Sequence, residues 1–324
     1  MKKYYIGVDL GGTNIAIAVT DEDYNILVKS SVPTLAERGG DAIAADMAAL
    51  AKKLCESLGI KITDVSGVGI ASPGTVNPET GIIESANNIR FRDFPMAQRF
   101  SEETGIPVEK IALGNDANLA ALGEYVAGTG RGTKSLVMIT LGTGVGGGVI
   151  IDGKVLTGFK FGGAELGHTT IVYNGRKCTC GRRGCFEAYC SATALVKLTK
   201  EKFIYERDTM MHEMCGGDIE KVGGKTAFAA ARMGDLVGRE VVSEYINYLA
   251  CGIANLINIF QPEILLIGGG VCNEGKNLLD PLFSKLDHEI YGTMYTKVAI
   301  ASLGNDAGMI GAAAAAMQKT AAKQ

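Results

Sequence analysis

The chain has 324 residues, of which 47% are hydrophobic and 21% charged, and its net charge is −3. This length fits one large domain or two of ordinary size, and the slight negative charge argues against a surface for nucleic acid or anionic membranes. The apolar stretches are too broken for a membrane span, and no secretory signal follows Lys2 and Lys3. We therefore expect a cytoplasmic protein, in which clustered cysteines indicate a metal or redox site before disulfides.

The secondary structure expected along the chain repeats itself. Residues 4–20 and 135–152 each contain an apolar strand, a glycine turn and an alternating strand, and a shorter strand with glycines follows at 65–76 and at 262–271. Helices are expected at 41–58, 116–127, 190–204, 226–233, 236–259 and 307–319. This pattern predicts an α/β chain with internal duplication, two lobes and a cleft between them. A single doubly wound sheet is the alternative.

The glycine turns of the two repeats are candidate phosphate-binding loops. The stretch GTGVGG at 142–147 matches G-x-G-x-x-G, but a dinucleotide-binding fold needs a helix after that motif, and a strand is expected here. Glycine lets phosphate approach the backbone N–H groups closely. Asp9, at the end of the first strand, could hold Mg²⁺ or only cap the turn. Two such turns in equivalent places favour an ATP-dependent transferase.

Asn115 and Asp116 stand between an apolar strand and a helix. Asp116 could serve only as the helix N-cap. Phosphoryl transfer to an alcohol, however, needs a carboxylate that orients the hydroxyl and accepts its proton, and Asp116 suits that task. The amide of Asn115, which both donates and accepts, could bind a neighbouring hydroxyl.

Three of the eight cysteines lie close together in CTCGRRGCFE, at Cys178, Cys180 and Cys185, and His168 lies shortly upstream. Three thiolates and one imidazole form a standard tetrahedral zinc set that leaves no position for water, so the zinc would be structural. The redox C-x-x-C spacing is missing, and C-x-C cannot readily close a relaxed disulfide. Free thiols or a redox role are the alternatives. Cys190 is a rival ligand, although its apolar helical surroundings favour packing.

The acids Glu165 and Glu187 flank the candidate metal ligands. A zinc ion would hold these carboxylates, and the second ring nitrogen of His168, in fixed directions. A site built to bond paired hydroxyls reads a polyol such as a sugar. The alternative for Glu187 is a solvated helix start.

The motifs DLGGT, NDAN, LGTGVGGG, GGAELGH and CTCGRRGCFE, in this order, resemble those of the ROK family (repressor, open reading frame, kinase), and most of all its ATP-dependent glucokinases. The resemblance runs from residue 4 to about residue 317; DLGGT alone is shared more widely among actin-like ATPases. It implies an actin-like, ribonuclease-H-like two-lobe fold with an interlobe cleft. It also implies transfer of the ATP γ-phosphoryl group to the 6-hydroxyl of a hexose.

The resemblance also assigns site residues, with Asp116 as the catalytic base. The sugar contacts that it implies are Gly74, Asn87, Asn115, Asp116, Glu165, His168 and Glu187. The phosphate loops match Gly11, Gly12 and Thr13 together with Thr143 and Gly144, beside Asp9, and the adenosine-side loop matches Gly268, Gly269 and Gly270. The structural Zn²⁺ ligands that it implies are His168, Cys178, Cys180 and Cys185.

The expected lobes are residues 1–114 with 305–324, and residues 115–304 with the zinc loop. The polar segment 203–225 is longer than the core plan requires and could be an insertion or an interface loop, in which Met210, Met211 and Met214 suggest packing. The resemblance implies a homodimer or homotetramer. Because the chain starts at its first strand, the DNA-binding extension of the family's repressors is not expected. Glucose is the expected substrate; fructose, mannose, allose or an N-acetylhexosamine, and a sugar sensor without catalysis, are the alternatives.

Overall fold

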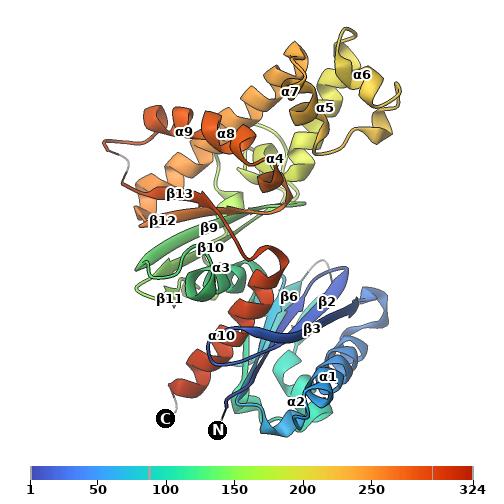
Figure 1. Cartoon of the computed structure of the whole chain (residues 1–324), viewed down its shortest axis with the longest axis vertical. Coiled ribbons are helices and arrows are strands. Elements are labelled where there is room, and N and C mark those ends of the chain that lie inside the picture. Colours follow the sequence, from blue (N-terminus) through green and yellow to red (C-terminus); the bar gives the residue numbers. More distant parts are fainter. Residues whose placement is uncertain (1, 87–88, 294, 323–324) are drawn as a thin grey trace. The chain divides into compact units, whose positions relative to one another are not determined.

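The computed structural model describes residues 2–86, 89–293 and 295–322, and the chain divides into two compact units (Figure 1). Unit 1 comprises Met1–Leu136, Gly148–Ala164 and Ala301–Gln324, and unit 2 comprises Val137–Gly147 and Glu165–Ile300. The lobe boundaries that we expect near residues 114 and 304 stay a prediction. Among the described residues, no helix has the length and apolar character needed to cross a bilayer.

A five-stranded sheet with the order β3-β2-β1-β4-β8 forms the centre of unit 1. Its strands are β1 (Tyr5–Leu10), β2 (Asn14–Thr20), β3 (Ile26–Pro33), β4 (Gly67–Ser72) and β8 (Ile111–Asn115). β1 pairs parallel with β4, and β4 pairs parallel with β8, so Asp9 lies opposite Ala71 and Ser72 opposite Asn115. The carboxyl ends of three strands therefore meet at one edge of the sheet, where ligands bind in open α/β sheets.

Four helices cover or flank this sheet: α1 (Gly40–Ser57), α2 (Met96–Thr104), α3 (Asp116–Ala127) and α10 (Ala307–Ala321). The alanine- and glycine-rich helix α10 packs on β1, β4 and α3 (Figure 1). A Cβ atom at Gly69 of β4 would lie 1.7 Å from the Ala312 carbonyl oxygen, and one at Gly311 would lie 1.6 Å from that of Leu119. Only glycine permits this backbone-to-backbone packing.

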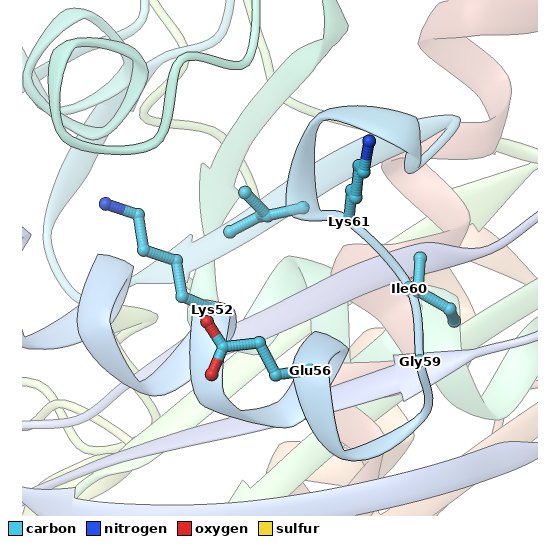
Figure 2. A pocket seen from close by; sticks show the side chains of 6 residues that line it. Lys52, Glu56, Gly59, Ile60 and Lys61 are labelled. Carbon is cyan, nitrogen blue, oxygen red and sulfur yellow. The ribbon is translucent and has the colours of Figure 1, made fainter.

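Helix α1 ends in a Schellman motif. The amide of Ile60 donates to the Cys55 carbonyl at 3.0 Å, and Gly59 between them takes the left-handed φ of 69° that this motif requires. The last turns of α1 and the residues that follow it line an open depression. Its lining residues are Lys52, Glu56, Gly59, Ile60, Lys61 and Ile62 (Figure 2).

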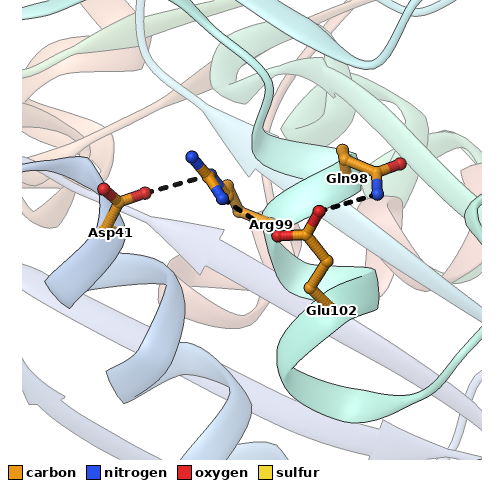
Figure 3. A network of polar contacts seen from close by, with 4 residues as sticks. All are labelled: Asp41, Gln98, Arg99 and Glu102. Carbon is orange, nitrogen blue, oxygen red and sulfur yellow. Dashed lines mark hydrogen bonds and ion pairs between the residues drawn. The ribbon is translucent and has the colours of Figure 1, made fainter.

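A small three-stranded sheet, β5 (Thr75–Asn77), β6 (Ile82–Ala86) and β7 (Phe91–Phe94), leads into α2. Arg99 of α2 pairs with Asp41 of α1 at 3.1 Å and with Glu102 at 3.0 Å, and Gln98 donates to Glu102 at 2.9 Å (Figure 3). These groups are exposed, so the network contributes little to stability.

The second five-stranded sheet has the order β11-β10-β9-β12-β13. Its strands are β9 (Ser135–Leu141), β10 (Val145–Ile151), β11 (Lys154–Val155), β12 (Ile264–Gly268) and β13 (Lys297–Ile300). With β9 matched to β1, this order is the same as in the first sheet. The internal duplication is therefore confirmed, and the alternative of a single doubly wound sheet is wrong.

The helices of unit 2 are α4 (Glu187–Cys190), α5 (Ala192–Tyr205), α6 (Met210–Met214), α7 (Thr226–Arg232), α8 (Leu236–Phe260) and α9 (Lys276–Glu289). Together with α1, α3 and α10, the helices α5, α7 and α8 confirm the six that the sequence predicts. Short 3₁₀ helices lie along the chain at η1 (Ala36–Arg38), η2 (Ile62–Asp64), η3 (Val108–Lys110), η4 (Leu166–His168), η5 (Ile219–Lys221), η6 (Gly270–Glu274) and η7 (Gly304–Asp306).

The polar segment 203–225 packs around a small apolar cluster of its own. This cluster contains Phe203, Met211, Cys215, Val222 and Ala230. Asp235, the N-cap of α8, anchors the segment because it accepts bonds from the Thr209 hydroxyl at 3.0 Å and the Met210 amide at 2.7 Å. Packing is confirmed for Met211, which is fully buried, but it is wrong for Met214, which is 42% exposed.

Candidate active site and metal centre

The first glycine turn joins β1 to β2 and is held from one side by Thr34. The amide of Gly11 donates to the Asn14 carbonyl at 2.9 Å. The buried Thr34 hydroxyl donates to the Gly11 carbonyl at 2.7 Å, and the Thr34 amide donates to the Thr13 carbonyl at 2.8 Å. Gly12 and Thr13 at the tip remain exposed. The turn is thus anchored at its base and open at its tip, as a phosphate-binding loop requires.

Asp9, at the end of β1, is half-buried. Burial, with a smaller contribution from the charge of Asp116, raises its pKa from 3.8 to about 6. A Cβ atom at Gly308 would lie 2.5 Å from Asp9 Oδ2, so this glycine admits the carboxylate beside the first turn of α10. The carboxylates of Asp9 and Asp116 are both desolvated, and the charge of Asp116 disfavours ionisation of Asp9. A hard divalent cation would stabilise the ionised carboxylates, so Asp9 fits a role with Mg²⁺.

The junction of β8 and α3 corrects one expectation. The N-cap of α3 is Asn115, whose Oδ1 accepts from the Asn118 amide at 3.1 Å, and not Asp116. Asp116 is the first helical residue, and its Oδ1 accepts from the Ala117 amide at 2.8 Å. Burial raises the pKa of Asp116, and the hydrogen bond from Ala117 opposes this shift only in part. The capping interpretation of Asp116 is therefore wrong, and its carboxylate has the raised pKa expected of a proton acceptor.

Gly74 follows β4 at the same edge of the sheet. Its φ is 88°, and a Cβ atom there would lie 2.0 Å from the Ser85 carbonyl oxygen, so only glycine fits. Its own carbonyl accepts from Asn115 Nδ2 at 3.1 Å. The structure thus brings Asp9, the turn at 11–13, Gly74 and the Asn115–Asp116 junction together in unit 1. Asn87 lies outside the described residues.

The second glycine turn, between β9 and β10, is bonded to the start of α5. The Ala192 amide donates to the Gly142 carbonyl at 2.8 Å, and the Thr193 hydroxyl donates to the Thr143 carbonyl at 2.8 Å. Thr143 is exposed, as is expected for a phosphate contact. Since β10 follows the turn as a strand, the dinucleotide-binding interpretation of GTGVGG is excluded.

Glu187, the first residue of α4, connects this turn to the cysteine loop. Its Oε2 accepts from the Val145 amide at 3.1 Å, and its Oε1 accepts from the Thr179 hydroxyl at 2.8 Å and the Cys178 thiol at 3.4 Å. A Cβ atom at Gly144 would lie 2.4 Å from Glu187 Oε2, so the glycine makes room for the carboxylate. The interpretation of Glu187 as a solvated helix start is therefore wrong.

Four side chains form a candidate metal centre: His168, Cys178, Cys180 and Cys185, whose ligand atoms all lie within 4.8 Å of one another. The Cys180 and Cys185 sulfurs are 3.6 Å apart, and Cys178 Sγ lies 3.7 Å from His168 Nδ1. Zn–S bonds of about 2.3 Å in a tetrahedron give sulfur–sulfur edges of about 3.8 Å, so the set fits zinc. Burial raises the pKa of Cys185 to about 12, a cost that a bound cation offsets by displacing the proton.

The cysteine loop is shaped by its glycines and by Arg182. Gly181 and Gly184 have φ angles of 89° and 81°, and a Cβ atom at Gly184 would lie 1.7 Å from the Val172 carbonyl oxygen. Arg182 donates to the His168 carbonyl at 3.0 Å and thereby holds the histidine segment against the loop. The sequence signals this loop through its cysteines and glycines, and neither Arg182 nor Thr179 was expected to contribute.

The remaining predicted residues of unit 2 flank these features. Glu165 is exposed and precedes η4, and its carbonyl accepts from the His168 amide at 3.0 Å. Gly268 ends β12, and Gly269 and Gly270 follow it. Gly269 has φ 91°, and a Cβ atom there would lie 2.4 Å from the Leu141 carbonyl oxygen. Cys190 is fully buried and, among the described residues, belongs to no metal-binding group, as its apolar surroundings predict.

Comparisons with known proteins agree with this set of motifs. The sequence profile of the ROK family matches residues 5–319. The glucokinase of Halalkalibacterium halodurans is 39% identical over 318 residues, which cover 95% of this chain and 93% of the relative. The glucokinase of Thermotoga maritima is 38% identical over 314 residues, covering 95% of each chain. The crystal structure of a ROK family glucokinase from Streptomyces griseus in complex with glucose and AMPPNP superposes with a TM-score of 0.80 at 35% identity, covering 97% of this chain and 99% of that one.

Proposed function

This chain belongs to the ROK family, with its actin-like fold, and from that premise we propose that it is an ATP-dependent glucokinase, which transfers the γ-phosphoryl group of ATP to the 6-hydroxyl of glucose. Glucose is favoured over the other hexoses and over a sugar sensor without catalysis, because the similar proteins above are glucokinases.

The observation that carries the proposal is the β8–α3 junction. Asn115 supplies the N-cap of α3, and Asp116 is the first helical residue, whose buried carboxylate accepts from the Ala117 amide at 2.8 Å. In our proposal Asp116 accepts the proton of the sugar hydroxyl as the hydroxyl attacks the γ-phosphorus. Its raised pKa supports this role, because a base works best when its pKa approaches the working pH.

ATP would be bound by the two glycine turns. We assign the phosphate contacts to Gly11, Gly12 and Thr13 in one turn and to Thr143 and Gly144 in the other, and the adenosine contacts to Gly268, Gly269 and Gly270. Asp9 would hold Mg²⁺, directly or through water. Bound with the nucleotide, Mg²⁺ would neutralise phosphate charge and so favour transfer.

The sugar contacts that we propose are the backbone of Gly74 and the polar side chains of Asn87, Asn115, Glu165, His168 and Glu187. Carboxylate oxygens accept from sugar hydroxyls, while the second ring nitrogen of a zinc-bound His168 carries a proton and donates. Such a set discriminates strongly against analogues that lack a hydroxyl, because its own polar groups would be left unpaired.

The zinc ion would be structural. His168 Nδ1 and the three thiolates would complete its coordination, which leaves no position for water or substrate. The bond from the Thr179 hydroxyl to Glu187 supports a positioning role, because it links the metal loop to a proposed sugar contact and does not need a protonated cysteine. A homodimer or homotetramer stays a prediction.

The proposal is tested by a coupled assay of ADP release with a panel of hexoses. We expect the kcat/KM for glucose to exceed those for fructose, mannose, allose and N-acetylglucosamine. An ATPase rate that no sugar raises would refute the kinase assignment. A higher kcat/KM for another hexose would refute only the choice of glucose.

A further inference from the structure

Glu124 of α3 is a buried acid that the proposed chemistry does not use. It is 0% exposed, and none of the ion pairs among the described residues includes it. Moving a carboxylate out of water is costly unless a cation or several hydrogen-bond donors compensate. Three donors compensate here, and each of them fixes the direction of one carboxylate oxygen.

The three donors come from two segments of unit 1 that are distant in the sequence. The Thr129 amide, just after α3, donates to Glu124 Oε2 at 2.9 Å. The Ser302 hydroxyl donates to Oε2 at 3.3 Å and the Leu303 amide to Oε1 at 2.6 Å, just after the chain returns from unit 2 to unit 1. A Cβ atom at Gly128 would lie 2.0 Å from Oε2, so this glycine makes room for the carboxylate.

Leu303 stands at the beginning of the segment that leads into α10. It is the N-cap of η7, and α10 follows η7 directly at Ala307. Backbone amides at the start of a helix carry a partial positive charge, which stabilises a carboxylate without a cation. A Cβ atom at Gly123 would lie 2.2 Å from the Ala307 carbonyl oxygen, so α3 and α10 meet backbone to backbone next to Glu124. The bond from Leu303 therefore fixes where α10 begins relative to α3.

Both helices lead to the candidate active site. Asp116 is the first residue of α3. Gly308, in the first turn of α10, lies against the Asp9 carboxylate, because a Cβ atom there would lie 2.5 Å from Asp9 Oδ2. Burial, and then the charge of Asp116, raise the pKa of Asp9 to about 6, so the two carboxylates are within electrostatic reach of each other. A shift of α10 against α3 would therefore move the backbone beside Asp9 relative to Asp116.

We propose that Glu124 is a positioning residue, which holds the start of α10 to α3 and thereby sets the distance between the carboxylates of Asp9 and Asp116. Because it is fully buried, Glu124 acts without touching substrate or nucleotide. Phosphoryl transfer depends chiefly on position and charge, and a misplacement of about 1 Å caused far from the chemistry can cost about 100-fold in rate. The effect on the rate rests on the proposed function, in which Asp9 holds Mg²⁺ and Asp116 is the base.

Two variants disturb the carboxylate in different ways. Glu124→Gln keeps its shape, but the NH₂ group cannot accept, so at least one of the three donors loses its partner. Gly128→Ala keeps the charge and places a Cβ atom 2.0 Å from Oε2, which displaces the carboxylate. Lys29→Met is the matched control, because it removes the exposed ion pair at 2.7 Å to Asp306 of the same η7 and leaves the buried bonds in place.

The kinetic test is the coupled ADP-release assay at saturating glucose and ATP. We expect kcat to fall about 10- to 100-fold in Glu124→Gln and in Gly128→Ala, and to stay within about 2-fold of wild type in Lys29→Met. The dissociation constant for glucose, measured by calorimetry without nucleotide, should stay close to that of wild type, because Asn115 is tied to the Gly74 carbonyl independently of α10.

Four results would overturn the proposal. One is a kcat close to that of wild type in a folded Glu124→Gln or Gly128→Ala variant, and another is an equally large fall of kcat in Lys29→Met. The third is a loss of glucose affinity as large as the loss of kcat, which is the sign of a generally loosened unit 1. The fourth is failure of both variants to fold, because Glu124 would then serve stability alone. If only Glu124→Gln fails to fold, Gly128→Ala decides.

Metal-dependent nucleotide binding gives a readout that needs no sugar phosphorylation. With Asp9 beside Mg²⁺, wild type should bind a non-hydrolysable ATP analogue more tightly in Mg²⁺ than in EDTA, and the folded variant should lose most of this difference while Lys29→Met keeps it. A difference as large as that of wild type would overturn the link from Glu124 to Asp9. If no sugar raises the ATPase rate of wild type, the proposed function fails, whereas this calorimetric comparison still decides the role of Glu124.

Discussion

Glu187 offers a way to separate two roles of one carboxylate. Its Oε2 accepts from the Val145 amide at the second glycine turn, and its Oε1 accepts from the Thr179 hydroxyl. Glu187→Ala removes both acceptors and leaves the N–H group of the buried Val145 unpaired. Glu187→Gln can keep its oxygen toward Val145 and turn its NH₂ group to Thr179, because a hydroxyl can accept as well as donate.

The expected magnitudes differ between the two variants. An unpaired buried donor costs about 1–3 kcal/mol, so Glu187→Ala should weaken binding of a non-hydrolysable ATP analogue, measured without sugar, about 5- to 150-fold. Glu187→Gln should change that affinity less than about 2-fold. Its kcat/KM for glucose should nevertheless fall about 10-fold, since a bond to a neutral acceptor is weaker than one to a charged acceptor by about 1–1.5 kcal/mol.

The assays are calorimetry with the ATP analogue and coupled ADP release at saturating ATP, with zinc content and thermal unfolding as controls for an intact loop. Equal analogue affinities of Glu187→Ala and Glu187→Gln would refute the link between Glu187 and the glycine turn. A kcat/KM for glucose within 2-fold of wild type in Glu187→Gln would refute its role as a sugar contact.

Three further predictions concern acidity, metal and packing. Burial raises the pKa of Asp116 above 3.8, and a base must be deprotonated to act. The kcat/KM for glucose should therefore rise with pH through a pKa above the ordinary carboxylate value. A kcat/KM that does not change with pH down to pH 4 would contradict this. Metal analysis of purified protein should find one zinc per chain. Cys180→Ser should lower both the zinc content and the affinity for glucose. Full activity of zinc-free protein would exclude the structural role of the zinc. Gly311→Ala should lower the free energy of unfolding by more than about 2 kcal/mol in denaturant unfolding, because its Cβ atom would lie 1.6 Å from the Leu119 carbonyl oxygen. The control Gly224→Ala has open space around it and should stay within about 0.5 kcal/mol of wild type. Equal stability of the two variants would contradict the close packing of α10.

Features encoded within a few residues could be predicted from the sequence. The strand pairs β1–β2 and β9–β10 carry their alternation and their glycine turns in one stretch each. Apolar residues recur at helical spacing in α1 and α8, while α10 is recognisable by its alanine-rich composition. The grouping of His168 with the three cysteines was also predictable, because metal ligands with short spacing need little tertiary information. The strands β5, β6 and β7 were missed, since strands of three to five residues give almost no periodic signal.

Contacts between distant segments could not be predicted in the same way. Nothing in the local sequence shows that Glu187 accepts from Val145, 42 residues away, or that Gly308 admits the Asp9 carboxylate. The exchange of the cap from Asp116 to Asn115 is a difference of one residue in where α3 begins, and sequence patterns resolve helix ends poorly. As the first helical residue, Asp116 has a raised pKa through burial, although its Oδ1 accepts from the Ala117 amide.

Asp116→Asn in the coupled ADP-release assay tests the account most directly. The amide has the shape of the carboxylate but cannot accept the proton, so we expect kcat to fall about 10²- to 10⁴-fold, with the dissociation constant for glucose changed by less than about 10-fold and unfolding unaltered. A folded Asp116→Asn variant that phosphorylates glucose at a rate within 10-fold of wild type would contradict the assignment of Asp116 as the catalytic base.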